Sequence, residues 1–203
     1  MLVLASASPR RRDLLAQAGY EFQILPAEIC EDLHPGEEPI AYVLRLAREK
    51  AEAVAASPEF AALCRTQAEP PLILGADTTV VAPNGEILLK PEDDADAARM
   101  LRLLSGATHQ VITGVALVAN GATETAAEVT EVTVLNLSDK DIATYVATGE
   151  PHGKAGAYGI QGRFARWVPR IRGCYFNVVG LPLARVSGMI DRARADTFVT
   201  REP

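Results

Sequence analysis

Three consecutive arginines, in the segment SASPRRR at residues 6–12, are the first residues along the chain that could form a functional site. Ser8 occupies a favourable N-cap position and Pro9 the first helical position, so Arg10–Arg12 fall in the first turn of a predicted helix. Cations there cost about 0.3–1 kcal/mol each, because the helix dipole is positive at its N-terminus. A bound phosphate would remove this conflict. A solvated basic turn is the alternative for any one arginine, but the whole group, with Ser6, favours an anion site.

A carboxylate that could activate water stands in LILGADTTVV, residues 72–81, where Asp77 directly follows an apolar run that predicts a buried strand. Ligands of open α/β sheets bind beyond the carboxyl ends of strands, so Asp77 is well placed. The Asn-Gly pair at 84–85 predicts a two-residue hairpin turn, whose register sets Lys90 opposite Thr79 and on the side of Asp77. An aspartate and a lysine would then converge on one surface. A simple cross-strand ion pair is the alternative.

Lys50 is a further cationic candidate, on the apolar side of the helix that spacing predicts for residues 40–55. A lysine there usually extends its stem along the apolar surface to water, and the sharper hypothesis is that its ammonium reaches an anion at the helix edge. The acidic loop before this helix, residues 27–39, holds Glu31 and Asp32. Either carboxylate could bind a metal ion, whereas a solvated acidic loop is the simpler interpretation.

A glycine-rich stretch, GEPHGKAGAYGIQG at residues 149–162, matches neither a Walker A loop nor the GxGxxG pattern. Gly159 and Gly162 would let the backbone approach a ligand closely. Gln161 lies between them and offers both a donor and an acceptor, which suits the edge of a nucleobase. A tight structural turn explains the same residues equally well.

The elements that must position these residues are predicted from apolar periodicity and from turn and capping residues. Strands are expected at 2–5, 22–25, 72–74, 109–118, 126–135 and 164–171. Helices are expected from Pro9, over 40–55 and 93–104, for about ten residues after Ser138 by their period, and over 181–194. Residues 57–71, which contain three prolines, predict a loop.

Composition narrows the class of protein. A net charge of −6 and a pI near 5.2 argue against a general nucleic-acid binder, so the arginine cluster is a local site. Cys30, Cys64 and Cys174 show no CxxC or Cys/His spacing, so neither a disulfide framework nor a zinc site is indicated, and reduced cytosolic thiols are expected. Neither a signal peptide nor a membrane-spanning stretch is predicted.

Several motifs occur in a recognisable order along the chain. They are SASPRR (6–11), RLAREKA (45–51), GADTTV (75–80), LLKP (88–91), LSGATHQVITGV (104–115), KAGAYGIQGR (154–163) and NVVGLPL (177–183). With them the sequence resembles the Maf family of nucleoside triphosphate pyrophosphatases, from Leu2 to about Val186. One such motif would be weak evidence, and this many in order is a strong signal.

The resemblance implies an α/β fold of the Maf/ITPase-like type, as a single domain over residues 1–203. The tail from about residue 196 is expected to fray, as chain ends commonly do. Two lobes would surround an elongated mixed central sheet with helices on its faces, and the active site would lie in the cleft. The implied reaction is hydrolysis of dTTP and UTP, with modified pyrimidine triphosphates as further candidates, to the monophosphate and pyrophosphate. The implied cofactor is a divalent metal cation, Mg or Mn.

The resemblance also implies a cytoplasmic enzyme linked to arrest of cell division. Its partner would be the nucleoside triphosphate substrate, with no nucleic acid and no membrane, and a homodimer is expected as one possible state. Two other functions stay open: a 7-methyl-GTP pyrophosphatase, as in a sister subfamily that lacks the Gln161-type loop, and a nucleotide-binding septation regulator with little turnover.

Roles for individual residues follow from the same resemblance. Asp77 matches the general base, and Ser6, Arg10, Arg11, Lys50 and Lys90 match phosphate-contacting positions. Arg11, Thr78 and Gln161 match specificity positions, and Glu31 matches an acidic position after the second strand. Asp77, Lys50, Lys90 and Glu31 are thus the expected catalytic set, with Glu31 and Asp77 as metal ligands.

The chain departs from the family pattern at two positions. Cys30 precedes Glu31 where the family usually has aspartate, which removes one possible metal ligand, and Asp32 is a potential substitute. Gly153 also stands where the family usually has aspartate. These departures concern metal binding and loop position, not the class of enzyme.

Overall fold

The computed structural model describes residues 1–199, which divide into two compact units. Unit 1 consists of Met1–Asp77, Gly114–Ala127 and the described residues from Gly180 onward, and unit 2 consists of Thr78–Thr113 and Glu128–Val179. Each unit is therefore assembled from segments that are far apart in the sequence.

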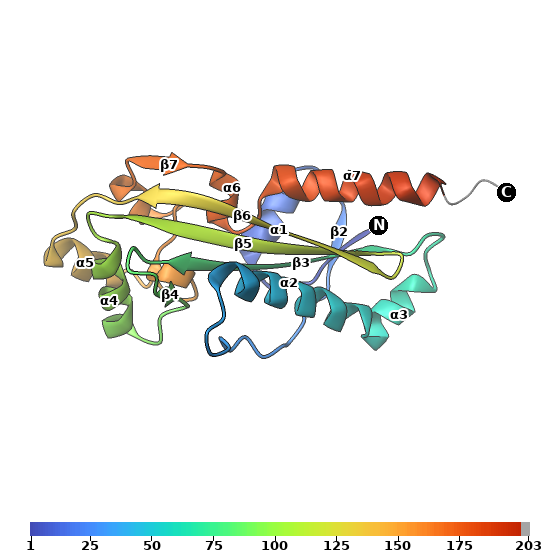
Figure 1. Cartoon of the computed structure of the whole chain (residues 1–203), viewed down its shortest axis with the longest axis horizontal. Coiled ribbons are helices and arrows are strands. Elements are labelled where there is room, and N and C mark those ends of the chain that lie inside the picture. Colours follow the sequence, from blue (N-terminus) through green and yellow to red (C-terminus); the bar gives the residue numbers. More distant parts are fainter. Residues whose placement is uncertain (200–203) are drawn as a thin grey trace. The chain divides into compact units, whose positions relative to one another are not determined.

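The strands form one mixed sheet in the order β2-β1-β3-β5-β6-β7, with β4 paired to β3 (Figure 1). They are β1 (Leu2–Leu4), β2 (Phe22–Ile24), β3 (Leu72–Val81), β4 (Ile87–Leu88), β5 (Thr108–Ala119), β6 (Ala122–Thr133) and β7 (Arg170–Arg172). β1 pairs in parallel with β2 and β3, whereas the β3–β4 and β6–β7 pairs are antiparallel. The predicted mixed α/β fold is confirmed.

The helices are α1 (Pro9–Gln17), α2 (Pro39–Ala55), α3 (Pro58–Cys64), α4 (Asp94–Leu104), α5 (Asp139–Val146), α6 (Tyr175–Val179) and α7 (Leu183–Val199), with short 3-10 helices η1 (Ala155–Ala157) and η2 (Arg163–Trp167). Among the residues that the structure covers, no helix has the length and apolar character needed to cross a bilayer. The tail predicted to fray from about residue 196 includes residues 200–203, which lie outside the described part, so that prediction stays open.

The strand–turn–helix unit at the start of the chain forms as predicted. β1 is fully buried, and the backbone is extended at Ser8 before α1 starts at Pro9. The Ser8 side chain makes no capping bond; instead the Ser8 N–H donates to Ser6 Oγ at 3.3 Å. The turn is therefore held by Ser6, one of the predicted anion-site residues.

The core of unit 1 forms between α2 and the strands β1 and β3. It consists of Val3, Ala5, Ala47, Ala51, Val54, Ile73 and Ala116. Figure 1 shows α2 and α7 on opposite sides of the strands. The small alanines on α2 allow this helix to approach the sheet closely, which decides where its remaining side chains can reach.

The loop predicted for residues 57–71 is wrong in its first half, which forms α3. Ser57 Oγ accepts a hydrogen bond from Phe60 N at 3.1 Å, and Pro58 begins the helix. Phe60 and Leu63 pack against the unit 1 core and stabilise this short element. The same Ser-Pro signal that marks α1 therefore also marks α3.

The predicted end of the third strand is also wrong. β3 has ten residues and continues through Asp77 to Val81, so Asp77 lies inside the strand. Its parallel pairing with β1 ends at Leu74. Asp77 is thus beyond the pairing with β1 but within a longer strand.

The hairpin after β3 differs from its prediction by one residue. Pro83 has no N–H to pair across a two-residue turn. Gly85, at φ +86°, instead donates its N–H to Ala82 O at 2.9 Å, which gives a longer loop. Val80 therefore pairs with Leu88, and the predicted pairing of Lys90 with Thr79 does not form.

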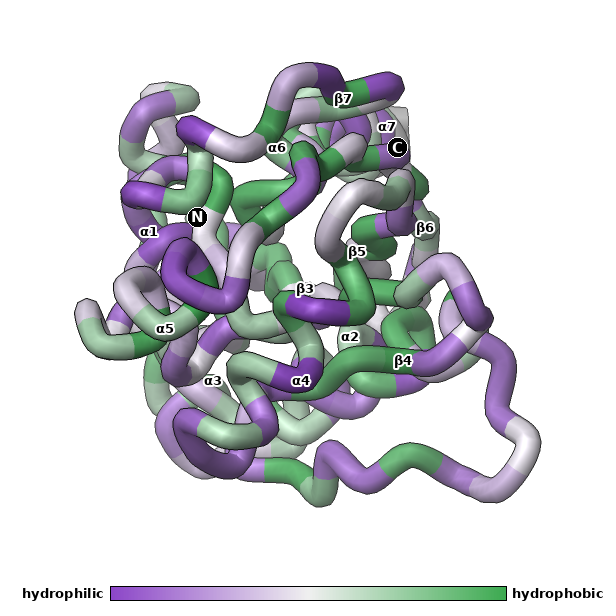
Figure 2. Tube along the Cα trace, turned by 90° about the vertical axis from the view of Figure 1, so that its left-hand side faces the viewer, coloured by the Kyte–Doolittle hydropathy of each residue, from purple (hydrophilic) through white to green (hydrophobic). Residues whose placement is uncertain are grey.

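Unit 2 contains α4 and α5, which pack on each other. The strand β5, which appears green near its label in Figure 2, contributes Thr108–Thr113 to unit 2 and its more apolar residues Gly114–Ala119 to unit 1. Ser138 caps α5 in a complete capping box, as its position predicts. β5 and β6 extend to a two-residue turn at Asn120–Gly121, both with positive φ, so β6 begins earlier than predicted. The strand predicted for 164–171 is wrong in its first part, because Trp167 belongs to η2 and packs edge-on against Tyr145 and Phe164; the strand β7 starts only at Arg170.

Candidate active site

Lys50 lies between two carboxylates in unit 1. Its Nζ is 2.7 Å from Asp77 Oδ1 and 2.5 Å from Glu31 Oε1. Lys50 is 7% exposed and Asp77 9%, whereas the Glu31 side chain is partly open to solvent. The ammonium predicted to reach an anion at the helix edge therefore meets two anions of the protein itself.

Gly75 explains why Lys50 and Asp77 meet. A Cβ on Gly75 would lie 2.1 Å from Ala47 O, so α2 contacts the backbone of β3 directly at this residue. Side chains alternate along a strand, which places Asp77 on the same face as Gly75. Lys50 follows Ala47 by about one helical turn and thus extends toward Asp77.

Arg11 is buried beside this group, at 9% exposure. Its Nε donates to Gly180 O at 2.9 Å and its Nη1 donates to Ser6 Oγ at 3.1 Å. Burial lowers the pKa of Arg11, and the negative charges of Asp77 and Glu31 oppose that shift. Arg11 therefore interacts electrostatically with both carboxylates that contact Lys50.

The three arginines of the first turn have different environments. Arg11 is buried, Arg10 is partly buried with its pKa lowered by burial, and Arg12 is exposed and pairs with Asp13 at 2.8 Å. Removing a first-turn cation is expected from the dipole to help stability slightly, but Arg11 bonds to Ser6 and to the distant Gly180 carbonyl. Its removal would take away the donor of the Gly180 carbonyl, whereas Ser6 Oγ would still accept from the Ser8 N–H.

Two side chains of α2 hold the acidic loop that carries Glu31. Tyr42 OH donates to Glu31 O at 2.8 Å, and Arg45 Nη2 donates to Asp32 O at 2.9 Å. Arg45 also binds both carboxylate oxygens of Glu37, at 2.7 and 2.8 Å, and lowers the pKa of Glu37 to about 2. Burial, with the charges of Asp77 and Glu31, raises the pKa of Tyr42 to about 12.

Tyr42 and Arg45 are residues of this site that the sequence analysis did not single out. Both precede Lys50 on the same helix, and Arg45 stands four residues before Glu49, which it also approaches, at 3.3 Å. That spacing suggested only an ordinary helix ion pair. The contacts to the loop carbonyls depend on how the loop folds, which the sequence pattern does not give.

Three of the predicted site residues belong to unit 2: Thr78, Lys90 and Gln161. Thr78 Oγ1 lies 2.9 Å from Thr113 Oγ1, and Thr113 Oγ1 donates to Asn177 O at 3.1 Å. Lys90 is exposed two residues after β4. Gln161 is exposed in the turn before η2.

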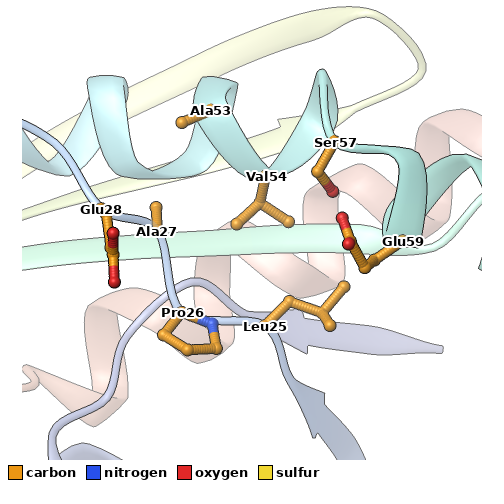
Figure 3. A pocket seen from close by; sticks show the side chains of 8 residues that line it. All are labelled: Leu25, Pro26, Ala27, Glu28, Ala53, Val54, Ser57 and Glu59. Carbon is orange, nitrogen blue, oxygen red and sulfur yellow. The ribbon is translucent and has the colours of Figure 1, made fainter.

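A separate hollow of unit 1 contains none of these residues. It has a volume of about 310 Å³ and lies between the segment after β2 and the junction of α2 and α3 (Figure 3). Its lining residues are Leu25, Pro26, Ala27, Glu28, Ala53, Val54, Ser57 and Glu59. The Ser57 hydroxyl in it is engaged by Phe60 N, so the hollow offers little polar chemistry beyond two surface carboxylates.

The family comparison decides how this group of residues is interpreted. A model of the Maf family, described as Maf-like protein, matches residues 1–193. The chain belongs to the Maf family. Its curated relatives include a protein of Koribacter versatilis that is 53% identical over 95% of this chain and 94% of the relative. A protein of Syntrophomonas wolfei is 49% identical over 98% and 99%, and one of Salmonella typhimurium is 51% identical over 96% and 93%. Each of these three relatives is named dTTP/UTP pyrophosphatase.

The structure also describes the two positions, Cys30 and Gly153, at which the resemblance implies a departure from the family pattern. Cys30 is exposed, and its Sγ donates to Asp32 Oδ2 at 3.1 Å, while Glu31 makes the contact to Lys50. Gly153 has φ +69° and open space around it. Aspartate tolerates this left-handed conformation better than most residues, so glycine and aspartate are compatible with the same loop at this position.

Proposed function

We propose that this protein is a dTTP/UTP pyrophosphatase, which hydrolyses these nucleotides to the monophosphate and pyrophosphate. The observation that carries the proposal is the buried Lys50, held between Asp77 and Glu31 beside Arg11. It occurs in a chain that is 53% identical to a relative named for this activity. Buried charges of both signs are costly to maintain and are concentrated at functional sites.

The cations of the site are proposed to bind the triphosphate. Cleavage at the α-phosphorus places negative charge on the leaving pyrophosphate, and preorganised cations stabilise that charge. The proposed phosphate-binding residues are Ser6, Arg10, Arg11, Lys50 and Lys90. Arg11 suits this task because its bonds to Ser6 and Gly180 already hold the guanidinium in place.

Asp77 is proposed as the general base. It accepts a proton from water while the water oxygen forms a bond to the α-phosphorus. The bond from that phosphorus to the bridging oxygen breaks, and pyrophosphate leaves with the electron pair. The contact with Lys50 orients the Asp77 carboxylate before the substrate arrives.

A pyrophosphatase of this family implies a divalent metal, and the donor set is compatible with one. Glu31 and Asp77 supply hard oxygen ligands, which Mg and Mn prefer. Within residues 1–199, no group of three His, Cys, Asp or Glu side chains could hold a metal. Mg is commonly held by one or two carboxylates plus substrate phosphates, so two carboxylates suffice. When bound, the ion would neutralise phosphate charge.

Thr78 and Gln161 are proposed to select the base. The Thr113 hydroxyl donates to Asn177 O, so its oxygen accepts the proton of the Thr78 hydroxyl. The Thr78 oxygen is then an acceptor toward a ligand, which suits the N3–H of uracil and thymine. Cytosine has an unprotonated N3 and would be rejected, because two acceptors would face each other.

The organisation of the chain is also proposed from the family match. Because the match spans residues 1–193 and hence segments of both units, we propose one Maf domain. A cytoplasmic location is proposed because the substrates are nucleotides. The homodimer and the link to arrest of cell division stay predictions.

A nucleotide panel tests the function. The purified protein is incubated with dTTP, UTP, CTP, purine triphosphates and 7-methyl-GTP, each with Mg or Mn, and both phosphate products are quantified. We expect metal-dependent release of pyrophosphate, fastest from dTTP and UTP. A preference for 7-methyl-GTP, sequential release of orthophosphate, or tight binding without turnover would each contradict the proposal.

A further inference from the structure

Gln161 is presented by a tight turn with a fixed backbone. A hydrogen bond of 3.0 Å from Gly162 N to Gly159 O closes the turn. Ile160 is 7% exposed and anchors the turn in the interior of unit 2, whereas Gln161 is exposed. The Gln161 amide therefore faces outward from a segment that the protein holds from within.

Both ends of this turn are held by one pair of side chains. Gly159 N donates to Tyr145 OH at 3.2 Å, and Arg163 N donates to Glu150 Oε2 at 3.1 Å. Tyr145 OH in turn donates to Glu150 Oε1 at 2.8 Å. Burial raises the pKa of the Tyr145 phenol, so it remains protonated and able to donate.

The Glu150 carboxylate lies directly against the turn backbone. A Cβ on Gly162 would be 2.1 Å from Glu150 Oε1, so any side chain at this position would force the Glu150 carboxylate to move away from the turn. The absence of a side chain at Gly162, predicted to allow approach of a ligand, is thus explained by the approach of Glu150. The carboxylate accepts from the Arg163 N–H and from the Tyr145 phenol, an arrangement that suits holding a loop.

The pair itself has little freedom. Tyr145 is 2% exposed, and its ring packs against Phe164 and Trp167. Glu150 N donates to Thr148 Oγ1 at 3.2 Å, and Lys154 Nζ donates to Glu150 O. The packing of Tyr145 in α5 against these two aromatic rings therefore helps to fix the position of the turn.

We propose that Glu150 and Tyr145 are positioning residues for base selection, because they hold the Gly159–Gly162 turn so that the Gln161 amide meets the base in one orientation. The inference rests on the proposed function, in which Gln161 contacts the base. A polar site rejects a wrong partner only if its donor and acceptor cannot rearrange. A loosened turn would let the Gln161 amide rotate and pair with cytosine.

The test compares kcat/KM for dTTP and CTP in Glu150→Ala and Tyr145→Phe. We expect the dTTP-to-CTP ratio to fall by about tenfold or more in Glu150→Ala and less in Tyr145→Phe, chiefly through KM for dTTP. Glu131→Gln, which removes another carboxylate of unit 2, should leave the ratio unchanged. If Glu150→Ala does not fold, Tyr145→Phe, which keeps the ring packing, decides the question.

A double variant separates positioning from general damage. Adding Glu150→Ala to Gln161→Ala should lower the ratio no further, because both changes remove the same interaction. Additive losses, or an unchanged ratio in a folded Glu150→Ala, would overturn the inference while dTTP and UTP remain the preferred substrates. A wild-type protein with no preference for dTTP and UTP over CTP would instead overturn the proposed substrate class, and the inference with it.

Discussion

Lys50 Nζ lies 2.7 Å from Asp77 Oδ1, although the two residues are 27 positions apart in the chain. The contact exists because α2 touches the β3 backbone at Gly75, two residues before Asp77. The second carboxylate on Lys50, Glu31, comes from a loop that Tyr42 and Arg45 hold. Backbone packing and loop anchoring thus place the charged group before any substrate binds.

Asp77→Asn should fold and lose activity. The asparagine oxygen can still accept from Lys50, and Glu31 keeps its ion pair with the ammonium, so no buried charge is left without a partner. The variant cannot accept a proton from water, and turnover of dTTP should fall by roughly 10²–10⁴-fold. Steady-state kinetics checks this, with circular dichroism as the folding control; near-normal turnover in the folded variant would exclude Asp77 as the base.

Gly75→Ala should damage both stability and activity. The added methyl would collide with Ala47 O, so α2 must move away from β3, at a cost of about 1–3 kcal/mol. Lys50 would then separate from Asp77. Gly188→Ala in α7 is the matched control, because the nearest atom to its methyl is 3.4 Å away, and it should be neutral or slightly stabilising. Urea unfolding midpoints of both variants measure the difference, and equal midpoints would refute the role of Gly75.

Arg45→Ala should weaken metal use more than it weakens folding. Without the bonds to Asp32 O and Glu37, Tyr42 alone anchors the loop to α2, so Glu31 is held less firmly against Lys50. The Mg or Mn concentration for half-maximal activity should rise by about tenfold, a loss typical of removing an outer support of a metal ligand. Arg48→Ala, an exposed arginine of the same helix, is the control. A metal response in Arg45→Ala equal to that of the control would show that Glu31 needs no such support.

His109 should make stability fall as the pH drops from about 6.5 to about 4. Burial in unit 2 lowers the pKa of His109 to about 4, from 6.5. Between these values the unfolded chain binds a proton that the folded chain does not, so acidification favours unfolding, by up to about 3 kcal/mol. His109→Gln should flatten this part of the pH–stability curve, measured by thermal unfolding. A curve unchanged by His109→Gln would mean that other groups cause the slope.

Patterns of neighbouring residues predicted the helices α1, α2 and α5 correctly. The N-cap and proline at 8–9 placed α1, and the apolar spacing of α2 placed Lys50 on the buried side. Ser138 and Asp141 supplied both halves of the α5 capping box. In each case the residues that decide the structure lie within one or two helical turns.

Contacts across the sequence could not be predicted in this way. The apolar run at 72–74 predicts a strand that ends before Asp77, yet β3 continues through Asp77, whose carboxylate pairs with Lys50. The place of Arg11 in the first helical turn predicts an anion site, but it does not predict the bond to Gly180 O, 169 positions away. Both outcomes depend on partners that no spacing rule connects.

Contacts between a side chain and a main-chain group cannot be predicted from patterns of side-chain types. Glu150 contacts Arg163 N and lies against Gly162, and neither contact requires a recognisable residue pair. The predicted hairpin register was wrong for a related reason. It followed the Asn-Gly signal at 84–85 and did not account for the missing N–H of Pro83. Gly162 acts through the side chain that it lacks, and Pro83 acts through the missing backbone N–H.

Hydrolysis of dTTP in water enriched in heavy oxygen tests the central claim most directly. Asp77 is proposed to activate water for attack on the α-phosphorus, so the heavy oxygen should appear in dTMP and the pyrophosphate should stay unlabelled. Mass spectrometry of both products after a single turnover reads the position of the label. Heavy oxygen in pyrophosphate, with unlabelled dTMP, would place the attack on the β-phosphorus and contradict the account.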